Sequence, residues 1–172
     1  AIELSGGIIG SKDPVHPNDH VNMSQSTNDV FPTAMHIAAS TGFVGDLIPA
    51  VEHLRDALAE KAELFASVIK IGRTHLQDAV PLTVGQEMSG WVSLLERDLH
   101  RLRYVLEDLY DLPIGGTAVG TGLNAHARFG PMAAERIAHL TGLPFRPHPN
   151  TFAALSAHDE LVSAHGAMAT LA

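Results

Sequence analysis

The sequence predicts an all-α protein, an elongated bundle of long helices. Two observations favour this fold class. Apolar residues recur every three or four positions over long runs, which places them on one face of an α-helix. No stretch of useful length alternates between apolar and polar residues as a half-buried strand does. The longest helical run, residues 84–109, predicts a rod of about 39 Å, against a radius of gyration of about 16 Å for a compact chain of this length.

The first half of the chain predicts a long polar loop and then a helix. Residues 11–32 hold three prolines and three asparagines and show little apolar periodicity. Loops of about 20 residues are unusual inside compact domains and usually have a function. From residue 33 to about residue 65 the apolar spacing is helical. Pro49 lies inside this run and is expected to kink or split the helix.

The second half predicts further helices separated by loops. Residues 70–83 form a second polar stretch, directly before the long helix at 84–109. A glycine-rich loop at 112–124, a short helix at 131–141 and a helix from residue 151 onward follow. The apolar seam of the long helix has heptad-like spacing and consists of Val84, Met88, Trp91, Leu95, Leu99, Leu102, Leu106 and Leu109.

Both ends of the chain read as interrupted helices. The chain opens with a single helical turn followed by two glycines, which is typical of a helix C-terminus. The helical pattern that begins at Glu160 reaches Ala172 without a glycine, proline or polar cap. We therefore expect residues 1–172 to be one partial domain, the central part of a longer protein.

The composition limits the partners of the protein. Its 11 basic and 19 acidic residues give a formal charge of -8, which argues against nucleic acid or an anionic membrane surface. The absence of cysteine excludes disulfides, thiolate metal sites and cysteine nucleophiles. No apolar run approaches the length of about 18 residues that a membrane span needs. The expected location is the cytoplasm, or the mitochondrion if a transit peptide was removed upstream.

A row of polar side chains precedes the first predicted helix. Such a row can hold a carboxylate or phosphate, because a helix N-terminus adds free N–H groups and a positive dipole end. Helix capping is the alternative, but capping needs only one such residue. The number of candidates therefore favours binding. The row consists of His16-Pro17-Asn18-Asp19 and Ser24-Gln25-Ser26-Thr27-Asn28-Asp29.

His75 is the candidate acid–base group of the second polar stretch. Histidine is the side chain that most often acts as a general acid or base, and Thr74 beside it can donate a hydrogen bond to a carboxylate. One histidine among 11 is more often a surface or core residue. The position of His75 between two long helices favours a functional role, since the sites of helical bundles form there.

Nucleotide and metal binding are not predicted. The glycines between Gly115 and Gly122 lack the Rossmann spacing and the P-loop lysine, so glycines at positive φ in tight turns are the expected explanation. His16 and His20 are four residues apart, but Pro17 argues against one helix face holding both, and no HExxH motif or carboxylate cluster accompanies them.

Three segments, in the same order, resemble the class II fumarases of the fumarase/aspartase superfamily. They are VHPNDHVNMSQSTNDVFPTAMHIA, KIGRTHLQDAVPLTVGQEMSGW and GGTAVGTGLN, and the likeness extends over residues 1–172. The resemblance implies the central helical domain of that fold. It also implies a homotetramer with a 20-helix core, in which each active site takes residues from three subunits.

The resemblance assigns roles by matching position. Ser26, Thr27 and Asn28 would bind a substrate carboxylate, as would Thr74; the family usually has serine where Thr27 stands. His75 would be the catalytic histidine that handles the proton of the water or hydroxyl.

A secondary dicarboxylate site is also implied by the resemblance. It would consist of His16, Asn18 and Asp19. This chain has Asp13 at a position where some family members have an arginine that contributes to the site.

The implied activity is fumarate hydration to L-malate, a step of the tricarboxylic acid cycle, with no metal or organic cofactor. Aspartases read GRTQ where this chain reads GRTH, so His75 favours a hydratase over an aspartase-like ammonia lyase. The family's proton-abstracting serine loop matches no part of residues 1–172, so this chain alone is expected to be inactive. A helical association module without activity is the alternative from another class. The expected partners are a small dicarboxylate and copies of the chain itself.

Overall fold

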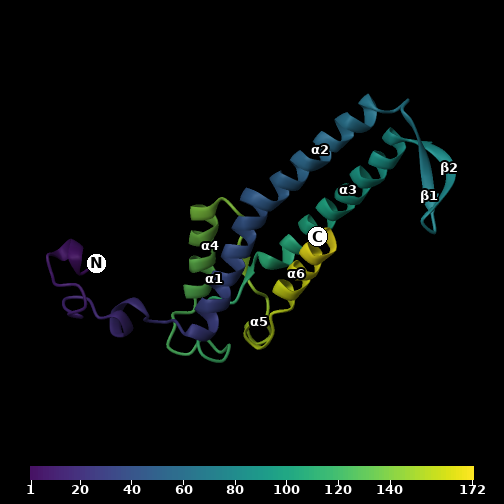
Figure 1. Cartoon of the computed structure of the whole chain (residues 1–172). Helices are drawn as coiled ribbons and strands as arrows, with labels where there is room; N and C mark the ends of the chain where they lie inside the picture. Colours follow the sequence, from purple (N-terminus) through teal and green to yellow (C-terminus); the bar gives the residue numbers. More distant parts are fainter. The chain divides into compact units, whose positions relative to one another are not determined.

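A computed structural model describes all residues, 1–172, and the chain divides into two compact units. The first unit contains Ala1–Ala38 and Leu109–Asp159, and the second contains Ala39–Asp108 and Glu160–Ala172. Helices dominate both units, as Figure 1 shows. The predicted helical fold class is therefore confirmed.

Two long helices form the body of the second unit. Helix α2 (Ile48–Leu64) and helix α3 (Val84–Leu109) lie side by side in Figure 1, and an ion pair between Glu52 and Arg103 links them. Helix α6 (Asp159–Leu171) contributes to a shared cavity with α3. The bounds of α3 agree with the prediction, because its apolar seam continues without interruption. The buried residues of this unit include Phe43, Ile48, Val51, Leu99, Leu102 and Leu106.

A β-hairpin connects α2 to α3, and the all-α prediction missed it. Strand β1 (Ile69–Thr74) pairs in antiparallel fashion with strand β2 (Gln77–Thr83). Most residues of both strands are exposed, so the sequence shows no apolar alternation. The register shifts next to Gly72, where an added Cβ would lie 2.7 Å from the Val80 carbonyl oxygen. The close approach of the two strands therefore requires glycine at this position.

Helix α1 (Thr27–Gly42) begins six residues earlier than the predicted start at residue 33. Pro32 was expected to end the polar loop, but it lies near the helix N-terminus, where a missing N–H is tolerated more easily. A π-helical segment, η3 (Phe43–Leu47), separates α1 from α2. Pro49 occupies the first turn of α2, but the helical run continues from Thr27 to Leu64, so the chain has a π-helical segment before Pro49 and the helix is not split there.

The glycine-rich segment of the first unit packs against helix α4 (Phe129–Thr141). An added Cβ at Gly115 would lie 2.7 Å from the Gly130 Cα atom, so only glycine permits this contact. Strands β3 (Asp111–Leu112) and β4 (Arg146–Pro147) form a short parallel pair beside it.

The predicted continuous helix from residue 151 onward is interrupted. Helix α5 (Thr151–Ser156) ends at Ala157, which is extended, and α6 begins at Asp159. Two further short helical segments precede α1. They are η1 (Glu3–Ser5), which ends at the predicted glycine stop, Gly6, and η2 (Pro17–Val21).

One helical run, Thr27–Leu64, is long and apolar enough to cross a membrane by length and composition alone. The sequence prediction considered only uninterrupted apolar runs and therefore did not identify this helix. The core helices of soluble proteins have the same property, and this run carries the buried polar residues Asp29, Thr33, His36 and Ser40. The run is weak evidence for a membrane span, and the absence of a membrane partner stays a prediction.

Candidate functional site

The first predicted site loop lies at the N-terminus of α1. Ser26 precedes the helix, and Thr27 and Asn28 are its first two residues. The Ser26 hydroxyl accepts the Asn28 N–H at 3.2 Å, while the Ser26 N–H donates to the Asp29 carboxylate at 2.9 Å. These reciprocal bonds resemble a capping box. Helix capping therefore occupies Ser26 and leaves the exposed hydroxyl of Thr27 without a partner in the chain.

Asn28 is fixed by the glycine-rich loop. Its side-chain amide donates to the Ala118 carbonyl oxygen at 2.7 Å. One amide hydrogen and the Oδ1 atom remain available, because a primary amide has two donors and one acceptor. The structure thus brings the first site loop together with residues 115–124, to which the sequence assigned only a geometric role.

The glycine-rich loop itself contains strained residues. Gly115, Gly120 and Gly122 have positive φ, as predicted, but so does Thr117 at 55°. A β-branched residue in this region is a backbone outlier, and such outliers cluster at functional sites. The Thr117 hydroxyl is buried and has no hydrogen-bond partner. The sequence gives no signal for this strain, since threonine is not a residue expected at positive φ.

A cavity of about 350 Å³ lies between the two loops of the first unit. Polar side chains and apolar groups both line it, an arrangement that is usual for small-ligand sites. Ser26 and Thr117 both line it. The other lining residues are Ser24, Gln25, Ala118, Val119, Thr121, Leu123 and Asn124.

His75 lies at the tip of the β1–β2 hairpin in the second unit. Thr74 is the last residue of β1 and pairs with Gln77, so His75 and Leu76 form a two-residue turn. Their φ values are 52° and 60°. Positive φ at both turn residues is normally supplied by Asn-Gly or Gly-Gly, so this turn is strained. Leu76 is 96% exposed.

Thr74 and His75 are both exposed, and neither side chain has a hydrogen-bond partner within the chain. The Arg73 and Asp78 side chains form an ion pair of 3.2 Å just below the turn. The hairpin therefore presents a free hydroxyl and a free imidazole at its tip. These two residues belong to the second unit, whereas residues 26–28 belong to the first.

The predicted secondary site lies around η2 in the first unit. His16 caps this segment: its Nδ1 atom accepts the N–H groups of Asn18 at 3.2 Å and Asp19 at 3.1 Å. An Nδ1 acceptor leaves the proton on Nε2, which remains free to donate to an anion. The His16 N–H in turn donates to His20 Nδ1 at 2.8 Å. The three predicted residues are therefore adjacent.

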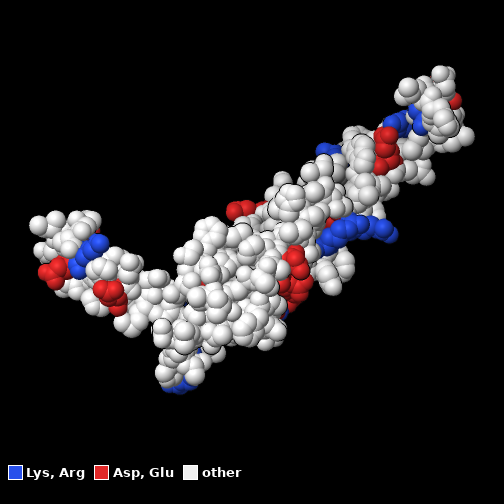
Figure 2. All heavy atoms as spheres, turned by 90° about the horizontal axis from the view of Figure 1, so that it is seen from below, with Lys and Arg blue, Asp and Glu red and all other residues white.

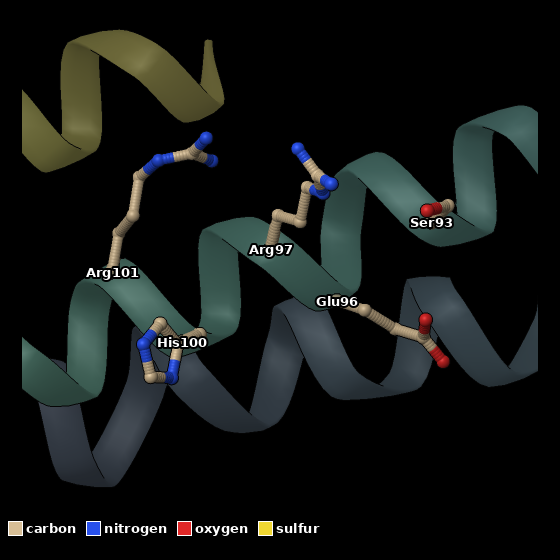
Figure 3. Close-up of a pocket in the computed structure, with 5 residues that line it drawn as sticks. All are labelled: Ser93, Glu96, Arg97, His100 and Arg101. Atoms are coloured by element: carbon tan, nitrogen blue, oxygen red, sulfur yellow. The ribbon is translucent and has the colours of Figure 1, made fainter.

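A different cavity, of about 460 Å³, lies along α3 and contains no predicted site residue. Figure 3 shows Arg97 and Arg101 extending to one side of α3, while Glu96 and His100 extend to the other. All five lining residues come from one face of α3, where the Arg97 and Arg101 side chains splay away from those of Glu96 and His100 and do not converge on one point (Figure 3). The predicted site residues lie outside this cavity, in the loops of the first unit and at the hairpin tip of the second.

Metal and nucleic-acid binding find no support in the distribution of charged residues. No group of three or more His, Asp or Glu residues is arranged to hold a metal ion. The face drawn in Figure 2 carries Lys and Arg in small groups among Asp and Glu, without a continuous basic surface. The expected lack of a metal, of a cofactor and of a nucleic-acid partner remains a prediction.

Comparisons with known proteins agree with the resemblance found in the sequence. A family model described as lyase matches residues 2–172. The chain is 62% identical to the mitochondrial fumarate hydratase of Rhizopus oryzae and 58% identical to the class II fumarate hydratase of Thermosynechococcus vestitus. All 172 residues align in both cases, covering 35% and 37% of these relatives. The chain thus spans little more than a third of their length.

A solved structure gives the same result. The crystal structure of the class II fumarase from Schistosoma mansoni matches with a TM-score of 0.94 and 42% sequence identity. The match covers 99% of this chain and 39% of that one. The predicted resemblance to class II fumarases, and the helical fold that it implied, are confirmed.

Proposed function

Because this chain belongs to the lyase family, we propose that the protein is a fumarate hydratase, which adds water reversibly to fumarate and gives L-malate. The observation that carries the proposal is the presence of His75, in the sequence GRTH, at the tip of a strained hairpin with its imidazole unpaired. The identity of 56% or more to fumarate hydratases across the chain supports it.

In the proposed reaction, residues 26–28 and the tip of the β1–β2 hairpin have separate roles. Ser26, Thr27 and Asn28 bind one carboxylate, with the N-terminal N–H groups and dipole of α1 adding to the attraction. Thr74 donates to substrate from the hairpin. Removal of the carbon-bound proton of malate spreads negative charge into a carboxylate, and fixed donors around that carboxylate stabilise the charge.

His75 is the proposed acid–base group for the departing hydroxyl. An imidazole can donate a proton to hydroxyl as it leaves and accept one from water in the reverse direction. Loss of ammonia needs no such group, since ammonia is the better leaving group at neutral pH. This difference favours a hydratase over an aspartase-like ammonia lyase. No metal or organic cofactor takes part in the scheme.

The proposed partners are a small dicarboxylate and three further copies of the chain. His16, Asn18 and Asp19 are proposed as the secondary dicarboxylate site, with the free Nε2–H of His16 as donor. The proposed location is the cytoplasm or the mitochondrion; three of the relatives carry the word mitochondrial in their names. The competing proposal is that the chain is a helical association module without enzymatic activity.

Incubating the full-length protein with fumarate, with and without ammonium, tests the proposal. We expect malate to form at ordinary enzymatic turnover, on the order of 10 per second, and no aspartate to accumulate. Aspartate as the main product would establish the ammonia lyase. If a correctly assembled protein forms neither malate nor aspartate, the protein is a helical association module without activity.

A further inference from the structure

Asp29 is the most deeply buried charged residue of the chain, with 0% of its surface exposed. It lies in the first turn of α1, and its carboxylate accepts three backbone N–H groups. Oδ1 accepts the Ser26 N–H at 2.9 Å, and Oδ2 accepts those of Gly115 at 3.1 Å and Thr117 at 2.9 Å. No lysine or arginine forms an ion pair with it. Its negative charge is therefore held by backbone groups alone.

The glycine-rich loop is shaped around this carboxylate. Gly115 and Thr117 have φ values of 98° and 55°, and their N–H groups converge on one oxygen atom. Converging N–H groups of this kind form a concave anion site. Positive φ is costly for a β-branched residue such as Thr117. The strained loop conformation is thus stabilised by its hydrogen bonds to the Asp29 carboxylate. Burial of that carboxylate would be unfavourable without these hydrogen bonds.

We propose that Asp29 is a positioning residue, whose carboxylate holds the glycine-rich loop against residues 26–28 and thereby orients the substrate-binding groups. Ser26 is held directly, through its N–H. Asn28 is held through the same loop, because its amide donates to Ala118 at 2.7 Å, one residue beyond Thr117. If the loop moves away, the Asn28 amide loses the contact that fixes its rotamer.

This inference rests on the proposed hydratase activity, so the wild-type, full-length protein is assayed first. A wild type without fumarate hydration would reject the proposed function and would say nothing about Asp29. With an active wild type, Asp29→Asn is the main variant. Its amide directs an NH2 group at one or more of the three backbone donors, which cannot accept it.

For Asp29→Asn we expect the KM for fumarate to rise about tenfold or more, with kcat changed by less than about threefold. Residues 26–28 contact the substrate in both ground and transition states, and loss of such uniform binding appears in KM. The inhibition constant of succinate, which binds without reacting, should rise in parallel. A merely structural role would lower the melting temperature and leave both constants of the folded fraction unchanged.

Asp98→Asn is the matched control. Asp98 is also a buried carboxylate, 6% exposed, but it lies in the second unit and pairs with Arg101 at 2.6 Å. It should lower stability without changing KM. If Asp29→Asn does not fold, Asp29→Glu keeps the charge and displaces the loop by one methylene group, and the same rise in KM is expected. An unchanged KM in either folded variant, or failure of both to fold, overturns the proposal, because Asp29 would then serve folding alone.

Discussion

His75 and Leu76 adopt positive φ although neither is glycine, and this strain is the strongest residue-level sign of function outside the sequence motifs. Each such residue costs on the order of 1–3 kcal/mol. The sequence identified His75 through its position in GRTH, but it could not predict the turn, because the usual Asn-Gly signal is absent. Asp29 was among the polar candidates, but neither its role nor that of Thr117 could be predicted, because both roles depend on contacts across more than 80 residues of chain.

Replacing His75 with Asn in the full-length protein should lower kcat by about 100- to 10,000-fold, the usual contribution of a general acid or base. Asparagine keeps a polar side chain and tolerates positive φ, so the turn should persist. KM should change much less. Steady-state rates of fumarate hydration measure both constants. An unchanged kcat would show that His75 is a surface residue without a catalytic role.

Replacing Leu76 with Gly should stabilise the protein by about 0.5–1 kcal/mol, because glycine adopts positive φ without strain. Leu76 is almost fully exposed, so no packing is lost. Thermal unfolding provides the measurement. Val80→Gly in the neighbouring strand is the control: Val80 is exposed but has no positive φ, and the change there should lower the melting temperature. Destabilisation by Leu76→Gly would show that the turn is not strained.

At the scale of elements, the bounds of a helix or strand could be predicted from the sequence where the element buries a regular apolar face. The bounds of α3 could be predicted because its seam repeats through 26 residues. The hairpin could not, since its strands are mostly exposed and its stability comes from backbone pairing and a Lys70–Glu87 ion pair of 2.7 Å. The start of α1 was predicted too late because Pro32 resembles a helix boundary, although it is tolerated in an early turn.

Gly72→Ala should disturb the hairpin and the activity together. The new methyl group would lie 2.7 Å from the Val80 carbonyl oxygen, so the strands must separate below Thr74 and His75. We expect kcat/KM to fall by about tenfold or more, since small displacements of catalytic groups are costly. Gly90→Ala in α3 meets nothing within 4 Å and serves as the control. Equal activity of the two variants would show that the hairpin geometry does not position the site.

At the scale of the whole molecule, the seam of α3 separates into two parts. Leu99, Leu102, Leu106 and Leu109 are buried within the chain, whereas Trp91 of the seam is exposed. Leu94, which lies outside the seam, is also exposed and lines a cavity together with Trp91 and Leu54 of α2. The cavity, of about 460 Å³, lies among these exposed apolar residues. Large apolar patches of this kind mark association surfaces. This arrangement supports the proposed tetramer and identifies the residues that test it.

Leu94→Asp should dissociate the full-length tetramer while leaving each subunit folded, because Leu94 is 61% exposed in the single chain. Leu102→Ala is the contrasting variant: Leu102 is 0% exposed, and its truncation should cost about 2–5 kcal/mol of folding stability. Light scattering and circular dichroism separate the two effects. A tetrameric Leu94→Asp protein would show that association uses another surface.

The isolated chain of residues 1–172 should be nearly inactive. Residues 26–28 and His75 belong to different compact units of the chain, and the serine loop that the resemblance assigns to removal of the carbon-bound proton matches no part of residues 1–172. Fumarate hydration by the purified chain, compared with the full-length protein at equal molar concentration, gives the result. Turnover near 10 per second would show that the missing family elements are dispensable.

The central proposal, which follows from the resemblance to class II fumarases, is that residues 26–28 of one subunit and His75 of another form a single fumarate site. Mixing tests it most directly: full-length Asn28→Ala and His75→Asn proteins, each nearly inactive at a fumarate concentration far below the raised KM of Asn28→Ala, are dissociated, combined and reassembled. If the loops come from different subunits, some sites in the mixed tetramers contain two intact loops. Fumarate hydration should then recover to about a quarter of the wild-type rate in a random mixture. Mixed tetramers that form and remain inactive would contradict the account.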